Sequence, residues 1–119
     1  MNNLAGKTLS LIVKHSALGA SGGNYLVRYA ADIELSSKTD IDVRIIGVYP
    51  NDPAPDDVEA AKNAIHKGCA QVLLPLSVGA CVIVRDLAIH PVDFKPEQFL
   101  RWTAIELQRK LATLTENNG

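Results

Sequence analysis

Residues 25–35 read YLVRYAADIEL, and this stretch indicates the class of fold. Its apolar residues recur at every second position: Val27, Tyr29, Ala31, Ile33 and Leu35. Polar side chains fall between them: Arg28, Asp32 and Glu34. Alternation of this kind is typical of an antiparallel strand with one face buried and the other in water.

The stretches on either side predict three more strands. Residues 8–13 and 41–49 are rich in β-forming side chains, and a polar turn at 36–40 precedes the second of them. We expect these runs and the 25–35 strand to form a meander of adjacent strands. Residues 78–84, VGACVIV, are almost continuously apolar. Such a run predicts a strand buried on both faces.

Two stretches carry apolar residues at helical spacing. The first helix is predicted at 56–73, where Asp56 and Asp57 favour the positive end of the helix dipole. The second is predicted at 96–114, because Pro96 suits the first turn of a helix. Their apolar stripes are Val58, Ala61, Ile65, Cys69 and Val72 in the first, and Leu100, Ala104, Leu107, Leu111 and Leu114 in the second.

The predicted order is βββαβα, which implies an α+β fold. We expect a two-layer α/β sandwich, in which a four-stranded sheet carries both helices on one face. No linker divides the chain, and 119 residues are enough to bury a core. We therefore expect one domain over residues 1–119, with its core from about 7 to 114.

Composition excludes several classes of protein. Twelve basic and thirteen acidic residues give a net charge of −1, so any contact with RNA has to be local, and DNA is not an expected partner. Cys69 and Cys81 lack Cys-x-x-Cys spacing, so both are expected to be reduced and buried. The chain begins without a signal-like segment, and no apolar run approaches the ~20 residues of a membrane span. A cytoplasmic protein without a membrane partner is expected.

The candidate binding residues gather on two loops. A glycine-rich loop at 19–23 precedes the long strand, and residues 89–93, IHPVD, follow the fourth strand. Both loops can lie at one end of the sheet, which we call the tip. Glycines there would let backbone N–H groups approach a phosphate or base, and His90 could donate hydrogen bonds or stack on a base. The predicted site consists of Gly22, Gly23, Asn24, Tyr25, His90 and Asp93.

Each of these features also has a plain structural interpretation. The glycines can simply form a turn, with His90 as an exposed loop residue. Asp93 precedes a helix and can cap its N–H groups. His15, at the end of the first strand, can join the tip, whereas His66 is expected to be a solvated residue of the first helix.

Three segments match, in order, the motifs of a known family. Residues 21–25, SGGNY, are similar to a Gly-Gly-x-Gly-x-Tyr segment. Residues 45–50, IIGVYP, and 64–68, AIHKG, resemble a Gly-Gly-Val-x-Pro strand end and an Ala-Val-Glu-Lys-Gly helix segment. Residues 90–93, HPVD, with Phe99 after them, look like a His-x-Val-Asp tip. Together they resemble the fourth domain of elongation factor G, and the likeness runs from about residue 7 to 112.

The resemblance implies a non-catalytic binding module. The family's domain reaches into the ribosomal decoding site and mimics the shape of a tRNA anticodon arm, so the ribosome or RNA is the expected partner. No catalytic residue, metal or cofactor is expected. The chain departs from the family where Asn24 replaces a tip glycine and where residues 94–97, FKPE, replace Ser-Ser-Glu. It also contains no Gly-x-x-x-x-Gly-Lys-[Ser/Thr] sequence, so GTP hydrolysis is not expected within these residues.

Two other interpretations remain open. The first is a protein-interaction or self-associating domain, which the near-neutral charge and an apolar cluster of Phe94, Phe99 and Trp102 favour. The second is a small-molecule kinase with a phosphate loop at 18–23, LGASGG. Such a loop leads into a helix, whose N-terminus holds the phosphate. Here it leads into a predicted strand, which disfavours the kinase.

Overall fold

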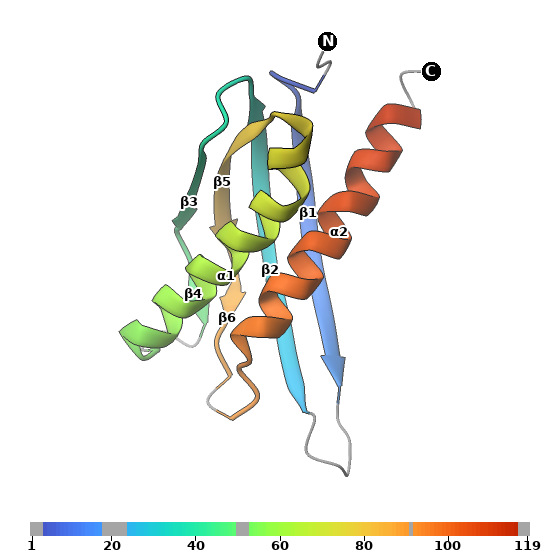
Figure 1. The fold of residues 1–119 in the computed structure, drawn as a ribbon. Helices are drawn as coiled ribbons and strands as arrows, with labels where there is room; N and C mark the ends of the chain where they lie inside the picture. The colour runs from blue at the N-terminus through green and yellow to red at the C-terminus, as the bar shows by residue number, and fades with distance from the viewer. Residues whose placement is uncertain (1–3, 18–23, 50–52, 91, 117–119) are drawn as a thin grey trace.

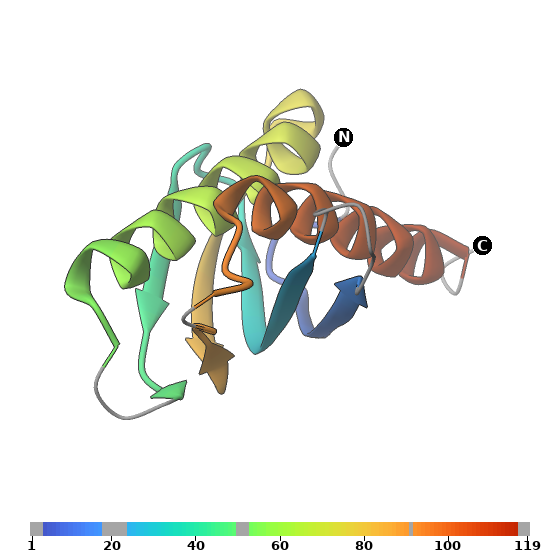
Figure 2. The same ribbon diagram turned by 90° about the horizontal axis from the view of Figure 1, so that it is seen from below.

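The structure, a computed structural model, describes residues 4–17, 24–49, 53–90 and 92–116. In chain order its elements are β1 (Thr8–Ala17), β2 (Tyr25–Ser36), β3 (Ile41–Ile45), β4 (Val48–Tyr49), α1 (Pro55–Leu73), the short 3-10 turn η1 (Leu74–Leu76), β5 (Gly79–Arg85), β6 (Leu87–Ala88) and α2 (Pro96–Glu116). Both helices lie on one face of the sheet (Figures 1 and 2). The predicted two-layer α/β sandwich is therefore confirmed.

The strand order differs from the predicted meander. The four-stranded sheet runs β1-β2-β5-β3, so β5 lies between β2 and β3. β2 pairs antiparallel with both β1 and β5, whereas β3 pairs parallel with β5. The apolar β5 occupies a central place in the sheet, and α1 provides the long connection that a parallel pair requires.

Gly79 explains how β2 connects to β3 across the start of β5. A Cβ atom at Gly79 would lie 1.9 Å from the carbonyl oxygen of Lys38 and 2.3 Å from that of Asp40. The connecting backbone therefore passes directly over this glycine, and any side chain would block it. The N–H of Ala80 donates to the Asp40 carbonyl at 3.1 Å, which fixes the crossing.

The predicted strand at 41–49 is two strands. β3 ends at Ile45, and β4 pairs in parallel with β6 in a second, two-stranded sheet. β6 was not predicted. It extends the path of β5 beyond Asp86, which has a positive φ of 57° and so bends the chain between the two strands.

The core lies between the sheet and the helices. Its largest fully buried side chains include Tyr29, Ile33, Leu35, Ile65, Leu73, Leu107 and Phe99. Phe99 contacts Phe94 edge-on at 5.3 Å between ring centroids, and both Phe94 and Trp102 pack against the core. Phe99 is therefore fully buried in the core, whereas Phe94 and Trp102 are partly buried and pack against it.

Among the described residues, no layer covers the other face of the sheet, and we call it the open face (Figure 2). Cys81 and Ile83 of β5 lie on this face and are half-buried, so the prediction that this strand is buried on both faces is wrong. Cys69 is buried as predicted, whereas Cys81 is more accessible than predicted, and both are free thiols. In the described parts of the chain, no helix is long and apolar enough to cross a membrane.

Candidate functional site

The loop after β6 holds His90 in a defined orientation. Its Nδ1 atom accepts hydrogen bonds from the N–H groups of Val92 at 3.2 Å and Asp93 at 3.0 Å. In the neutral imidazole the proton then resides on Nε2, which is left to donate outward. The His90 side chain is 43% exposed, so this donor is available to a ligand at the surface.

Among the described residues, the Asp93 carboxylate accepts no hydrogen bond from the first turn of α2, so the cap that the sequence suggested is not observed. The regular helical hydrogen bonds begin at the carbonyl of Lys95, which accepts from the N–H groups of Gln98 and Phe99. The Asp93 carboxylate lies 3.8 Å from His90 Nδ1 and is 19% exposed. Within the described residues, its recorded side-chain contact is therefore with the loop histidine.

A backbone hydrogen bond ties this loop to the start of β2. The N–H of Leu26 donates to the carbonyl of Asp93 at 3.0 Å. His90 and Asp93 therefore lie at the same end of the sheet as Asn24 and Tyr25, as expected for one tip (Figure 1). The other two predicted residues, Gly22 and Gly23, lie outside the described residues.

Tyr25 and His15 face the helices and not the open face. The hydroxyl of Tyr25 accepts a hydrogen bond from Trp102 Nε1 at 3.2 Å. The His15 ring stacks on Trp102, with the centroids 3.6 Å apart and the planes at 9°, and its Nε2 lies 3.8 Å from Glu106 Oε1. Both side chains thus help to dock α2 onto the hairpin, and a role for Tyr25 in binding stays a prediction. His66 is exposed on α1, as expected.

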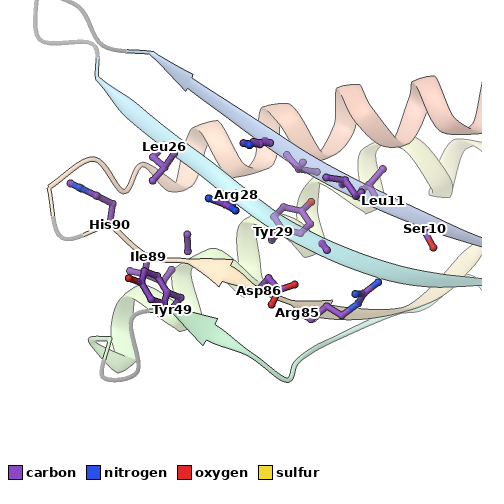
Figure 3. A pocket seen from close by; sticks show the side chains of 15 residues that line it. Ser10, Leu11, Leu26, Arg28, Tyr29, Tyr49, Arg85, Asp86, Ile89 and His90 are labelled. Atoms are coloured by element: carbon purple, nitrogen blue, oxygen red, sulfur yellow. The ribbon is translucent and has the colours of Figure 1, made fainter.

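A groove of about 1010 Å³ begins beside His90 and runs over the open face (Figure 3). Strands β1 and β2 form one side of it, and the segment from Arg85 to His90 forms the other. Exposed apolar side chains line it, among them Ile12 and Tyr49, each 73% exposed. An apolar groove with a few charged groups is the usual form of a ligand site.

Two positively charged side chains lie directly opposite one another in this groove. The register pairs Lys14 of β1 with Arg28 of β2, and both side chains are exposed and line the groove. Within the described residues neither forms an ion pair. By contrast, Arg85, also in the groove, donates to both carboxylate oxygens of Asp32 at 3.2 and 3.1 Å. Like charges directly opposite one another across two strands destabilise a sheet, and an anion bound between Lys14 and Arg28 would relieve that repulsion.

Sequence reasoning missed Lys14, Arg28 and Tyr49 as site residues. The first strand was predicted to end at Val13, whereas β1 continues to Ala17 and includes Lys14. Lys14, His15 and Ser16 are three consecutive polar residues, so no alternation in the sequence indicates that the strand continues beyond Val13. Pairing with Arg28 depends on the hairpin register, which the sequence does not give.

The site contains no metal centre among the described residues. No three His, Cys, Asp or Glu side chains are grouped there to hold an ion. The groups available in and beside the groove are the cations of Lys14 and Arg28, the paired Arg85, the carboxylate of Asp86, an imidazole donor and exposed apolar and aromatic surface. Their chemistry suits binding of an anionic ligand with flat apolar parts.

Comparison with known proteins supports the fold alone. No known protein family and no curated protein matches the chain. Among solved structures, a protein of Thermus thermophilus superposes with a TM-score of 0.58 and 16% identity over 87% of this chain. The match covers 15% of that protein, so the chain spans a small part of its length.

Proposed function

We propose that this domain is a non-catalytic module that binds single-stranded RNA, with ribosomal RNA as the first candidate, through the groove and the adjoining His90 loop. The observation that carries the proposal is the pairing of Lys14 with Arg28. This arrangement lowers the stability of the free domain, and a bound phosphate would neutralise it. The two cations are therefore better suited to a ligand than to the fold.

The surroundings of the cations favour a nucleic acid over a simple anion. Tyr49 and His90 line the same groove and expose flat rings on which unpaired bases can stack. Stacking of one base on an aromatic side chain contributes about 1–3 kcal/mol. Since the chain has a net charge of −1, attraction for RNA has to be local, which favours a short stretch of RNA.

The resemblance to the fourth domain of elongation factor G supports the same class of ligand. His90 and Asp93 resemble that family's tip motif; His90 lies at the end of the groove, and Asp93 lies beside His90. The protein-interaction module considered from the sequence loses part of its support, because Phe99 is fully buried in the core and Phe94 and Trp102 pack against the core.

The test is the salt dependence of binding to a fluorescently labelled single-stranded RNA, followed by fluorescence anisotropy. Each phosphate contact contributes about 0.7 to the slope of log affinity against log salt for single strands. Lys14→Gln and Arg28→Gln are each expected to reduce the slope by about that amount. His90→Ala is expected to weaken binding by about 1 kcal/mol or more, with little change in slope.

Arg44→Gln provides the matched control. Arg44 is an exposed arginine of β3 that is paired with Asp42 at 2.8 Å and does not line the groove. This variant is expected to bind RNA as the parent does. Equal losses in the Arg44, Lys14 and Arg28 variants, or failure of the parent protein to bind RNA or cosediment with ribosomes at low salt, would contradict the proposal.

A further inference from the structure

The outer edge of β1 presents a row of backbone groups that pairs with no other described strand. The N–H of Leu35 donates to the Lys7 carbonyl at 2.8 Å, which places Lys7 in a hydrogen-bonded pair with β2. Hydrogen-bonded pairs recur at every second residue of an antiparallel ladder, so the odd-numbered residues of β1 turn their backbone groups toward β2. The even-numbered residues Ser10, Ile12 and Lys14 therefore turn theirs away from the sheet, and β1 is its terminal strand. Each offers one donor and one acceptor to another strand.

Helix α2 forms the second wall of a cleft along this edge. Figure 2 shows the C-terminal half of α2 extending past β1. A cavity of about 280 Å³ lies between them, lined by Ser10, Leu11 and Ile12 of β1 and by Glu106, Arg109, Lys110 and Thr113 of α2. An exposed strand edge beside a helix is the geometry in which extended peptides add to a sheet.

The charges around the cleft are predominantly positive. Glu106 is engaged by Arg109 at 2.7 Å, which leaves little free negative charge on this wall. Lys110 lines the cleft, Lys14 lies at its edge, and neither has an acidic partner in the described part of the chain. The exposed Ile12 offers an apolar contact on the open-face side. An occupant with acidic and apolar side chains would complement both features.

We propose that the cleft between β1 and α2 binds an extended acidic segment of another protein, which adds to the sheet as a further strand. Backbone hydrogen bonds to Ser10, Ile12 and Lys14 would provide the register, and Lys110 would select for acidic side chains. The overhang of α2 favours a single strand over a second copy of the domain. A second copy paired through β1 would bring its own overhanging helix to the same face of the joined sheet.

The test is an NMR titration of the ¹⁵N-labelled protein with a synthetic peptide in which Glu and Val alternate. The amide signals of Ser10, Ile12 and Lys14 are expected to shift, and their hydrogen exchange is expected to slow on binding. A matched peptide with Lys in place of Glu is expected to bind at least tenfold more weakly. Absence of shifts at these amides up to millimolar peptide, or equal binding of both peptides, would overturn the proposal.

Two variants separate edge pairing from general attraction. Ile12→Pro removes an N–H group that faces the free edge and leaves every hydrogen bond to β2 intact, so it is expected to abolish peptide binding. Ile12→Val keeps this N–H donor and is expected to bind the peptide as the parent protein does. Lys110→Glu is expected to weaken binding about three- to fivefold, while Lys67→Glu, the same charge change at an exposed position of α1, leaves it unchanged. If these amides are instead protected in the free protein and sedimentation shows a dimer, the edge pairs with a second copy and the peptide site is refuted.

Discussion

Reversal of one charge in the groove is expected to stabilise the domain while it abolishes RNA binding. Lys14→Glu replaces the like-charged pair with Arg28 by an opposite-charged pair in the same register. Two unit charges about 7 Å apart interact in water by about 0.6 kcal/mol, and the substitution changes the sign of that term. Screening at physiological salt roughly halves the difference. We therefore expect the free energy of unfolding to rise by about 0.5 kcal/mol, within the range known for cross-strand pairs.

The assay is urea denaturation at low and high salt, with RNA binding measured in parallel. Lys14→Gln removes the repulsion without adding an attraction, so about half of the gain is expected. Arg28→Glu is expected to give the same gain as Lys14→Glu. The double variant that combines Lys14→Glu with Arg28→Glu has two negative charges opposite one another. It is expected to return to the stability of the parent protein while it remains unable to bind RNA.

High salt is expected to remove the differences in the free energy of unfolding among these variants. Near 1 M salt the Debye length falls to about 3 Å, so all of these differences in stability are expected to disappear. If Lys14→Glu is no more stable than the parent protein at low salt, or if the double variant keeps the gain, the two side chains do not face one another as the register requires. The proposed anion site would then lose its main support.

Four further predictions concern the core and the half-buried Cys81. Gly68→Ala is expected to lower the free energy of unfolding by about 1–3 kcal/mol despite the higher helix propensity of alanine, because the new methyl would meet a backbone carbonyl of α2 at 2.7 Å. Tyr29→Phe and Thr103→Val are each expected to cost about 1–2 kcal/mol, and a double-mutant cycle should show coupling, because their buried hydroxyls hydrogen-bond to each other at 2.5 Å. In the native protein a thiol reagent is expected to modify Cys81 well before Cys69. Burial raises the pKa of the Cys69 thiol from 9.0 to about 12. The thiol's contribution to the free energy of unfolding is therefore complete below pH 9 and is lost as the pH rises toward 12. Urea denaturation at several pH values is expected to show a smaller loss of stability over this range in Cys69→Ala than in the parent protein.

The periodicity of the sequence was sufficient to predict the layers but not the order of strands. Apolar residues at every second position in 25–35 become the buried face of β2, and the two apolar stripes become the buried faces of α1 and α2. Periodicity reports which face is buried, whereas strand order depends on contacts between distant segments. The close approach of Gly79 to the backbone at Lys38 and Asp40 permits this order, and a single glycine in an apolar run does not indicate it.

The sequence predicted the position of site residues only in the loops that follow or precede neighbouring strands. His90 and Asp93 lie beside the start of β2 because of a bond from Leu26, as the topology suggested. Tyr25 was assigned to the tip surface, but it belongs to the side of β2 that faces the helices, and its hydroxyl contacts Trp102. Lys14 was missed because its partner across the hairpin is set by a register that the intervening loop determines.

The residues that carry the resemblance to elongation factor G do not support RNA binding equally. Gly68 lies where α1 crosses α2 so closely that a side chain would not fit, and any protein with this helix packing needs a glycine there. His90 and Asp93 also have a structural role, because the histidine accepts two backbone hydrogen bonds that shape its own loop. Lys14 and Arg28 lie outside every matched motif, and the fold does not explain them, because their repulsion opposes folding. A feature that lowers stability without a structural purpose is better support for a ligand than a motif residue whose packing already accounts for it.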